Sequence, residues 1–171
     1  AGLSYARRIH QRIDAGLSLK YLFEKIDVNT ASGYAVDAGL VYRPPVNGLK
    51  LGATLQNLGS MNSLRTEETA LPWLFRLGAA YEVPLKMSGV KVNLASDLVK
   101  ISEENLHLHL GSEFVIWQQI ALRAGWMMGY ETHNFTLGIG FLRSSLRLDY
   151  GFVPYGEDLG STHRFTINFL L

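Results

Sequence analysis

Hydrophobic and polar residues alternate with a period of two along most of this chain. Between residues 145 and 152, for example, Leu146, Leu148 and Tyr150 alternate with Arg147 and Asp149. Successive side chains of a β-strand point to opposite faces of its sheet, so such a segment has one apolar and one polar face. The pattern predicts about eleven strands, at 2–9, 13–24, 33–43, 49–57, 73–83, 90–99, 106–116, 120–131, 134–142, 145–152 and 164–171.

The length of these segments and the placement of charge favour a membrane barrel. Most span about nine to twelve residues, whereas strands of soluble sheets average about five to six. A tilted strand that crosses a membrane needs about nine to eleven. Charged residues lie almost entirely on the polar face; the exception, Arg7, lies near a strand end, where its long side chain can reach water. We therefore expect an all-β, antiparallel transmembrane β-barrel with lipid on its apolar face and a polar interior.

The connections between segments indicate an orientation and a strand number. Short and long connections largely alternate, as do the periplasmic turns and outer loops of outer-membrane barrels, although the connection at 132–133 is short for an outer loop. The longest is expected at 58–72. This phase places Leu171, at the end of the last strand, on the periplasmic side. An even-stranded barrel would then need an odd number of strands before Ala1, so we expect a single-domain C-terminal part (1–171) of a barrel with twelve, fourteen or sixteen strands.

Composition excludes several other classes of protein. Hydrophobic residues make up 47% of the chain, yet the mean hydropathy is only +0.07. No run of about 18 apolar residues occurs, which excludes a helical membrane protein. The net charge is +1 and basic residues form no patch, so nucleic acid is not an expected partner. There is no cysteine to form a disulfide or a thiolate metal site.

Five stretches, taken together and in order, carry a family resemblance. They are GLSYA at 2–6, LGATLQNLG at 51–59, RLGAAY at 76–81, ALRAG at 121–125 and, most specifically, LDYGFVPYGEDLGSTHR at 148–164. This set resembles the PorV/PorQ family of Gram-negative outer-membrane proteins, whose fold is similar to the fourteen-stranded FadL-type barrel. The resemblance implies an N-terminal hatch and three strands before Ala1. The chain departs from barrels of this kind by ending Phe169-Leu170-Leu171 instead of on an aromatic residue.

The resemblance also implies a role and a location. Such a protein would reside in the cell outer membrane and take part in type IX secretion, by binding or shuttling cargo, or in the passage of hydrophobic molecules. Its expected partners are membrane lipid and either secreted protein cargo or hydrophobic small molecules. Two alternatives are a membrane-barrel enzyme and a soluble β-barrel or sandwich that turns its apolar face inward and binds a ligand.

The polar face supplies the candidate functional residues, which would line the interior. Opposite charges on neighbouring strands predict cross-strand ion pairs, and the alternative is a selective pathway along the lumen. The lumen-facing candidates are Arg76, Asp97, His107, His109, Glu113, Arg123, Arg147, Asp149 and Arg164.

Two further sets of residues invite a chemical interpretation. His107 and His109 lie two positions apart on the polar face with Glu113, but a metal site needs three ordered ligands, so we expect no metal and no cofactor. Ser161, His163 and Asp158 comprise the residue types of a hydrolase triad. Their spacing imposes no triad, because that arrangement is spatial, so we expect no catalytic residues and no enzymatic activity.

Overall fold

The computed structural model describes residues 1–27, 29–62, 69–131, 134–156 and 160–169, and in these ranges the chain forms strands and no helix. Each strand follows a stretch in which the sequence alternates between apolar and polar residues. The strands are β1 (Gly2–His10), β2 (Ile13–Ile26), β3 (Asn29–Tyr42), β4 (Leu49–Met61), β5 (Thr69–Ala70), β6 (Leu74–Val83), β7 (Val90–Ile101), β8 (Leu106–Ile116), β9 (Ile120–Met128), β10 (Phe135–Arg143), β11 (Leu146–Pro154) and β12 (Ser161–Phe169).

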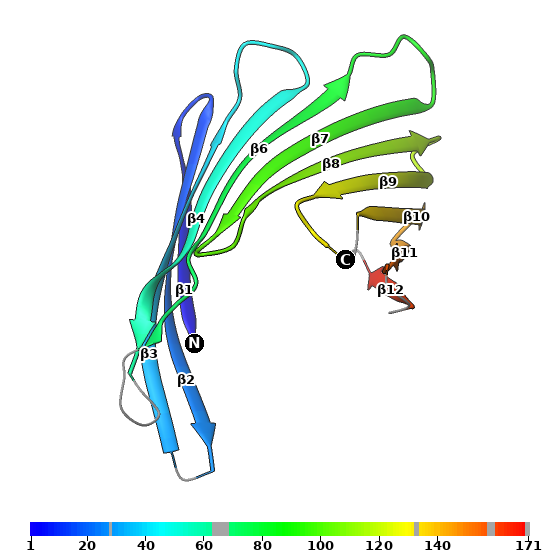
Figure 1. Cartoon of the computed structure of the whole chain (residues 1–171). Coiled ribbons are helices and arrows are strands. Elements are labelled where there is room, and N and C mark those ends of the chain that lie inside the picture. Colours follow the sequence, from blue (N-terminus) through cyan, green and yellow to red (C-terminus); the bar gives the residue numbers. More distant parts are fainter. Residues whose placement is uncertain (28, 63–68, 132–133, 157–159, 170–171) are drawn as a thin grey trace. The chain divides into compact units, whose positions relative to one another are not determined.

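All of these strands belong to one sheet. Its order is β1-β2-β3-β4-β6-β7-β8-β9-β10-β11-β12 (Figure 1). The short β5 pairs with β4 beside this path. Each main strand therefore neighbours the strands that precede and follow it in the sequence. The prediction of an all-β fold with eleven antiparallel strands is confirmed. The order has two ends, β1 and β12, so the sheet formed by the described residues is not closed.

The chain divides into two compact units. In the first, β2 and β3 form the longest ladder, which runs without a break from Ile13 opposite Tyr42 to Ile26 opposite Asn29 (Figure 1). In the second, the strands from β8 to β12 form four successive antiparallel pairs. The first unit comprises Ala1–Pro45, Lys50–Gly78 and Val99–Leu106, and the second Val46–Leu49, Ala79–Leu98 and His107–Leu171.

The apolar face of the strands is the exposed one. Tyr34, on a strand with a neighbour on each side, is 71% exposed, and Trp126 and Ile139 in the second unit are both 48% exposed. By contrast, every buried hydrophobic residue in the described ranges lies, by strand alternation, on the polar face. These residues are Ala31, Ala35, Val99 and Ala121. The described chain therefore has almost no hydrophobic core, and what is buried is small and lies opposite the apolar face.

Of two connections expected from the sequence, one is shorter in the structure and the other lies outside the described residues. The expected loop at 58–72 is too long, because β4 continues to Met61 and pairs there with β5. The short connection expected at 132–133 lies outside the described residues. The described residues therefore show only part of the expected alternation between long and short connections.

The ends of two later strands also differ from those predicted. The strand expected at 120–131 ends at Met128, since Gly129 has a φ of +92° and turns the chain out of the ladder. The last strand begins earlier than expected, at Ser161. The expected terminal residue of that strand, Leu171, lies outside the described residues.

The longer strands also bring additional charges onto the apolar face. Alternation places Lys25, Lys100 and Arg143 on the same side as the apolar residues of their strands. Each lies within one residue of a strand end. Arg7 lies three positions before the end of β1, and no other charge falls on the apolar face of the described strands.

A β-bulge explains why β4 extends further than the alternation suggested. Val36 pairs with Leu58 and Ala38 with Leu55, so two residues of β4 lie opposite the single residue Asp37. The inserted residue changes the spacing of apolar positions from two to three, which keeps Leu55 and Leu58 on the same face. A prediction that assumes a strict period of two therefore ends the strand at the bulge.

Asn57 occupies the bulge in a left-handed conformation, with a φ of 60°. Its backbone N–H donates a hydrogen bond to Oδ1 of Asp37 at 2.9 Å, and its side-chain oxygen accepts one from Lys20 at 3.2 Å. Lys20 Nζ lies 2.5 Å from Oδ2 of Asp37. Asparagine adopts positive φ more readily than most residues, so this side chain suits both the backbone and the polar group around it.

We predict that Gly59→Ala destabilises the first unit by about 1–3 kcal/mol. A Cβ at Gly59 would collide with the carbonyl oxygen of Tyr34 and with Cα of Ala35, so the backbone of β3 would have to shift. The free energy of unfolding in detergent, measured by urea titration with circular dichroism, tests this. Gly52→Ala is the matched control in the same strand, because its Cβ would meet nothing closer than 3.8 Å. Equal effects of the two substitutions would contradict the prediction.

Candidate functional site

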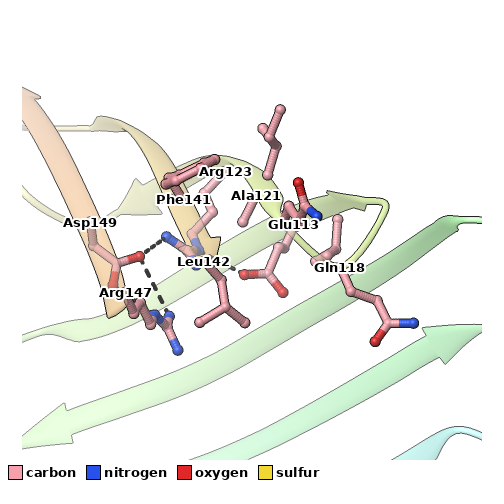
Figure 2. A pocket seen from close by; sticks show the side chains of 12 residues that line it. Glu113, Gln118, Ala121, Arg123, Phe141, Leu142, Arg147 and Asp149 are labelled. Atoms are coloured by element: carbon pink, nitrogen blue, oxygen red, sulfur yellow. Dashed lines mark hydrogen bonds and ion pairs between the residues drawn. The ribbon is translucent and has the colours of Figure 1, made fainter. Parts of the chain in front are cut away.

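A cluster of charged side chains spans neighbouring strands on the polar face of the second unit. Nε of Arg123 on β9 donates to Oε2 of Glu113 on β8 at 2.7 Å, and its Nη1 donates to Oδ1 of Asp149 on β11 at 2.7 Å. Arg147 Nε donates to the other oxygen of Asp149 at 2.7 Å, and Asn93 Nδ2 donates to Oε1 of Glu113 at 3.0 Å. We call these five residues the Arg123 cluster. Figure 2 shows Arg123 between the two carboxylates.

Two glycines of β10 make this cluster geometrically possible. Strand β10 lies between β9 and β11, and it places Gly138 opposite Arg123 and Gly140 opposite Asp149. A Cβ at Gly140 would lie 2.7 Å from Oδ1 of Asp149 and 3.1 Å from Nη1 of Arg123. The Arg123 side chain can therefore reach across β10 to Asp149 only because the intervening position carries no side chain.

The cluster is electrically balanced and partly shielded from solvent. Two guanidinium groups face two carboxylates, and the side chains of Arg123, Glu113 and Asp149 are 29%, 28% and 19% exposed. Each carboxylate oxygen accepts a hydrogen bond from within the cluster. Charge-assisted bonds of this length hold the side chains in fixed positions. The cluster therefore supplies a rigid polar surface whose carboxylate oxygens are all bonded within it.

A hollow lies beside the cluster. Its lining combines Glu113, Arg123, Arg147 and Asp149 with uncharged residues near the two short turns at the ends of β8 and β10. Figure 2 shows Gln118, Phe141 and Leu142 among these residues. The hollow is thus bounded by fixed, mutually neutralised charges on one side and by amide and apolar groups on the other.

The structure brings together only some of the residues predicted from the sequence. Glu113, Arg123, Arg147 and Asp149 join in the cluster just described. Arg76, Asp97 and Arg164 lie on the polar faces of their own strands, and their side chains make no hydrogen bond or ion pair with another residue within the described ranges.

His107 and His109 meet at Tyr130. Nε2 of His109 lies 2.9 Å from the Tyr130 hydroxyl, and the rings of His107 and Tyr130 stack with centroids 4.1 Å apart. His107 is only 4% exposed. Both histidines thus pack against Tyr130, and within the described ranges no group of three His, Cys, Asp or Glu residues could hold a metal ion.

Further polar contacts in the first unit escaped the list of candidate residues. Arg8 Nε lies 3.1 Å and Arg43 Nη2 lies 2.5 Å from the Asp14 carboxylate. The hydrogen bond to Asp14 raises the pKa of the Arg43 guanidinium above its ordinary value, so this group stays charged. The contacts at Asp14 are nevertheless the cross-strand ion pairs expected from the sequence, because alternation puts Arg8, Asp14 and Arg43 on the polar face. In the second unit, the list of candidates also lacked Asn93, which bonds to Glu113, and Tyr130, which contacts His109.

The Ser/His/acid set is only partly within the described ranges. Asp158 lies outside them. Ser161 and His163 are both described, and the odd-numbered positions of β12 place them on the apolar face with Phe165 and Ile167. They are therefore separated from the polar-face clusters by the sheet itself.

Comparisons with family models, with curated proteins and with solved structures gave no match. Within the described part of the chain, no helix has the length and apolar character needed to cross a membrane.

We predict that Arg123 and Glu113 are energetically coupled. A double-mutant cycle with Arg123→Gln and Glu113→Gln should give a coupling free energy of about 1 kcal/mol, because both side chains are partly shielded from water. Urea titration of the four proteins in detergent measures it. The Arg8–Asp14 pair is the control: Arg8 is 65% exposed, and its coupling should be smaller. A larger coupling for the control pair would contradict the assignment of the Arg123 cluster as the more tightly held group.

Proposed function

We propose that this chain forms part of a transmembrane β-barrel of the outer membrane, with its apolar face against lipid and its polar face lining the interior. One observation carries the proposal. Large apolar side chains are exposed on the strands of both units, whereas the buried hydrophobic residues of the described ranges are few and lie on the polar face.

The free energy of hydration favours this arrangement over a water-soluble one. Each exposed apolar side chain costs about 1.5–3 kcal/mol in water relative to burial, and contiguous apolar patches on soluble monomers seldom exceed a few hundred Å². Hydrocarbon removes that cost. It also tolerates a sheet whose backbone groups are paired by neighbouring strands, whereas it excludes charge from the middle of the lipid-facing surface. The placement of charges toward strand ends on the apolar face supports the same proposal.

The Arg123 cluster supports the assignment of the opposite face to the interior. Its two carboxylates and two guanidinium groups are only partly exposed and bond to one another across strands. Such a network suits a polar lumen, where the charges keep access to water. The soluble alternative predicts the opposite arrangement, with this face on the outside and the apolar face packed.

The biological role that we propose rests on the resemblance of the sequence to the PorV/PorQ family. It is participation in type IX secretion, by binding or shuttling protein cargo, or the passage of hydrophobic molecules through the outer membrane. The partners would be membrane lipid and, correspondingly, secreted protein or hydrophobic small molecules. The exposed apolar face supports the membrane location.

Tryptophan fluorescence with brominated lipids tests the membrane proposal. The chain has three tryptophans, Trp73, Trp117 and Trp126. Replacing the first two with Phe leaves Trp126, which lies on the apolar face of β9. In vesicles whose lipids carry bromine on the acyl chains, the emission of Trp126 should be strongly quenched relative to vesicles without bromine.

The control moves the single tryptophan to the other face. In a protein with all three tryptophans replaced by Phe, Thr136→Trp places the probe on the polar face of β10, opposite Gly125. This probe should escape the brominated lipids and respond to a water-soluble quencher instead. The proposal would be overturned by efficient lipid quenching of the probe at position 136 with none of Trp126, or by a chain that remains water-soluble and does not bind vesicles.

A charge in the middle of the apolar face should oppose insertion. We predict that Ile139→Arg lowers the free energy of unfolding from lipid by about 2–4 kcal/mol, because the guanidinium would face hydrocarbon. Thr136→Arg, on the polar face of the same strand, should cost much less. Reversible unfolding in lipid vesicles, followed by tryptophan emission, gives both values; a larger effect at position 136 would reverse the assignment of the two faces.

A further inference from the structure

Three hydrogen-bonding side chains lie together on the apolar face of the β11–β12 hairpin. Tyr150 belongs to β11, and Ser161 and His163 belong to β12. The ladder pairs Phe152 with His163 and Tyr150 with Phe165, so all of these side chains project from the same face. The register therefore brings Tyr150, within an aromatic surrounding, beside two polar residues that follow it by eleven and thirteen positions in the sequence.

The trio has the connectivity of an activated nucleophile. Ser161 Oγ lies 3.1 Å from Nε2 of His163, and Nδ1 of the same ring lies 2.8 Å from the Tyr150 hydroxyl. With its proton on Nδ1, His163 donates to the Tyr150 oxygen and turns the lone pair of Nε2 toward the Ser161 hydroxyl. A nucleophile bonded to a base, and a base held in place by a third group, is the arrangement that activates a serine.

The surroundings indicate what kind of molecule would bind. The ring centroid of Phe152 lies 5.3 Å from that of His163, and the ring of Phe165 lies 4.9 Å from that of Tyr150. Both phenylalanines are apolar neighbours suited to an acyl chain, and Phe165 is 77% exposed. We propose that Ser161 and His163 hydrolyse carboxylic esters of acyl-chain amphiphiles, with Tyr150 as the positioning residue for His163. Membrane lipid as the natural source of the ester rests on the proposed function.

The reaction is balanced with water as the second substrate. Ser161 Oγ attacks the ester carbonyl while its proton passes to Nε2 of His163. The tetrahedral intermediate collapses, the C–O bond to the alcohol breaks, and the alcohol leaves with the proton from His163. Water then attacks the acyl-serine, again giving a proton to His163, which returns it to Ser161 Oγ as the carboxylic acid departs.

Covalent labelling of the full chain in detergent micelles tests the nucleophile. An alkyl fluorophosphonate should modify Ser161 selectively, as located by mass spectrometry of the digested protein. Ser161→Ala should abolish labelling, whereas Ser145→Ala, which removes an exposed serine from the turn before β11, should leave it unchanged. No labelling of the folded chain, or labelling that persists in Ser161→Ala, would overturn the proposal. Because this measurement requires no bilayer, it can fail or succeed separately from lipid insertion.

Hydrolysis of p-nitrophenyl esters separates chemistry from folding. His163→Ala should lower kcat by about 10²-fold or more, and added imidazole should restore part of it, which a purely structural role would not permit. Tyr150→Phe should lower kcat with little change in KM. Esters with long acyl chains should be preferred over acetate, given the aromatic neighbours. Wild-type turnover equal to that of Ser161→Ala, with circular dichroism unchanged, would reject the activity.

Discussion

The separation of apolar and polar side chains onto opposite faces of one sheet is the constraint on which the rest of this structure depends. A period-two sequence can satisfy it only as extended strands, and strands of nine to fourteen residues then present two broad surfaces. In water, a second layer would have to cover the apolar surface. In the described chain it remains exposed, and the small buried residues lie on the other side. The proposed membrane location places lipid against the apolar face and so removes the cost of its exposure.

The same constraint shapes the polar face. Charges excluded from one surface are concentrated on the other, where neighbouring strands bring them within reach of one another. Arg123 bonds Glu113 on the adjacent strand and Asp149 two strands away, and it does so over a position where β10 has only Gly140. Glycine is usually a weak choice within a strand, but here it provides the space through which an ion pair crosses. A small residue on one strand is thus matched to long polar side chains on the strands beside it.

Much of the fold was predictable because alternation is a local signal. All eleven main strands were foreseen, and the side of the sheet on which each of Glu113, Arg123 and Asp149 lies follows from parity. The bulge at Asn57 was not predicted, because one inserted residue shifts the period of two although the strand continues. Nor does the sequence indicate that Arg123 bonds to Asp149, whereas the side chains of Arg76 and Arg164 do not join the cluster. That depends on which strands neighbour one another and on the register between them.

Register also explains how a polar group can exist on the apolar face. Ser161 and His163 lie at the beginning of β12, and Pro154, opposite Ser161, ends β11. In a membrane barrel, the ends of strands lie near the interface, where aromatic and amphipathic side chains are common. Neutral serine, histidine and tyrosine side chains that bond to one another are tolerated there at a lower cost than a charge would be at mid-strand. The position that makes such a trio compatible with lipid is also the position at which a lipid ester would be within its reach.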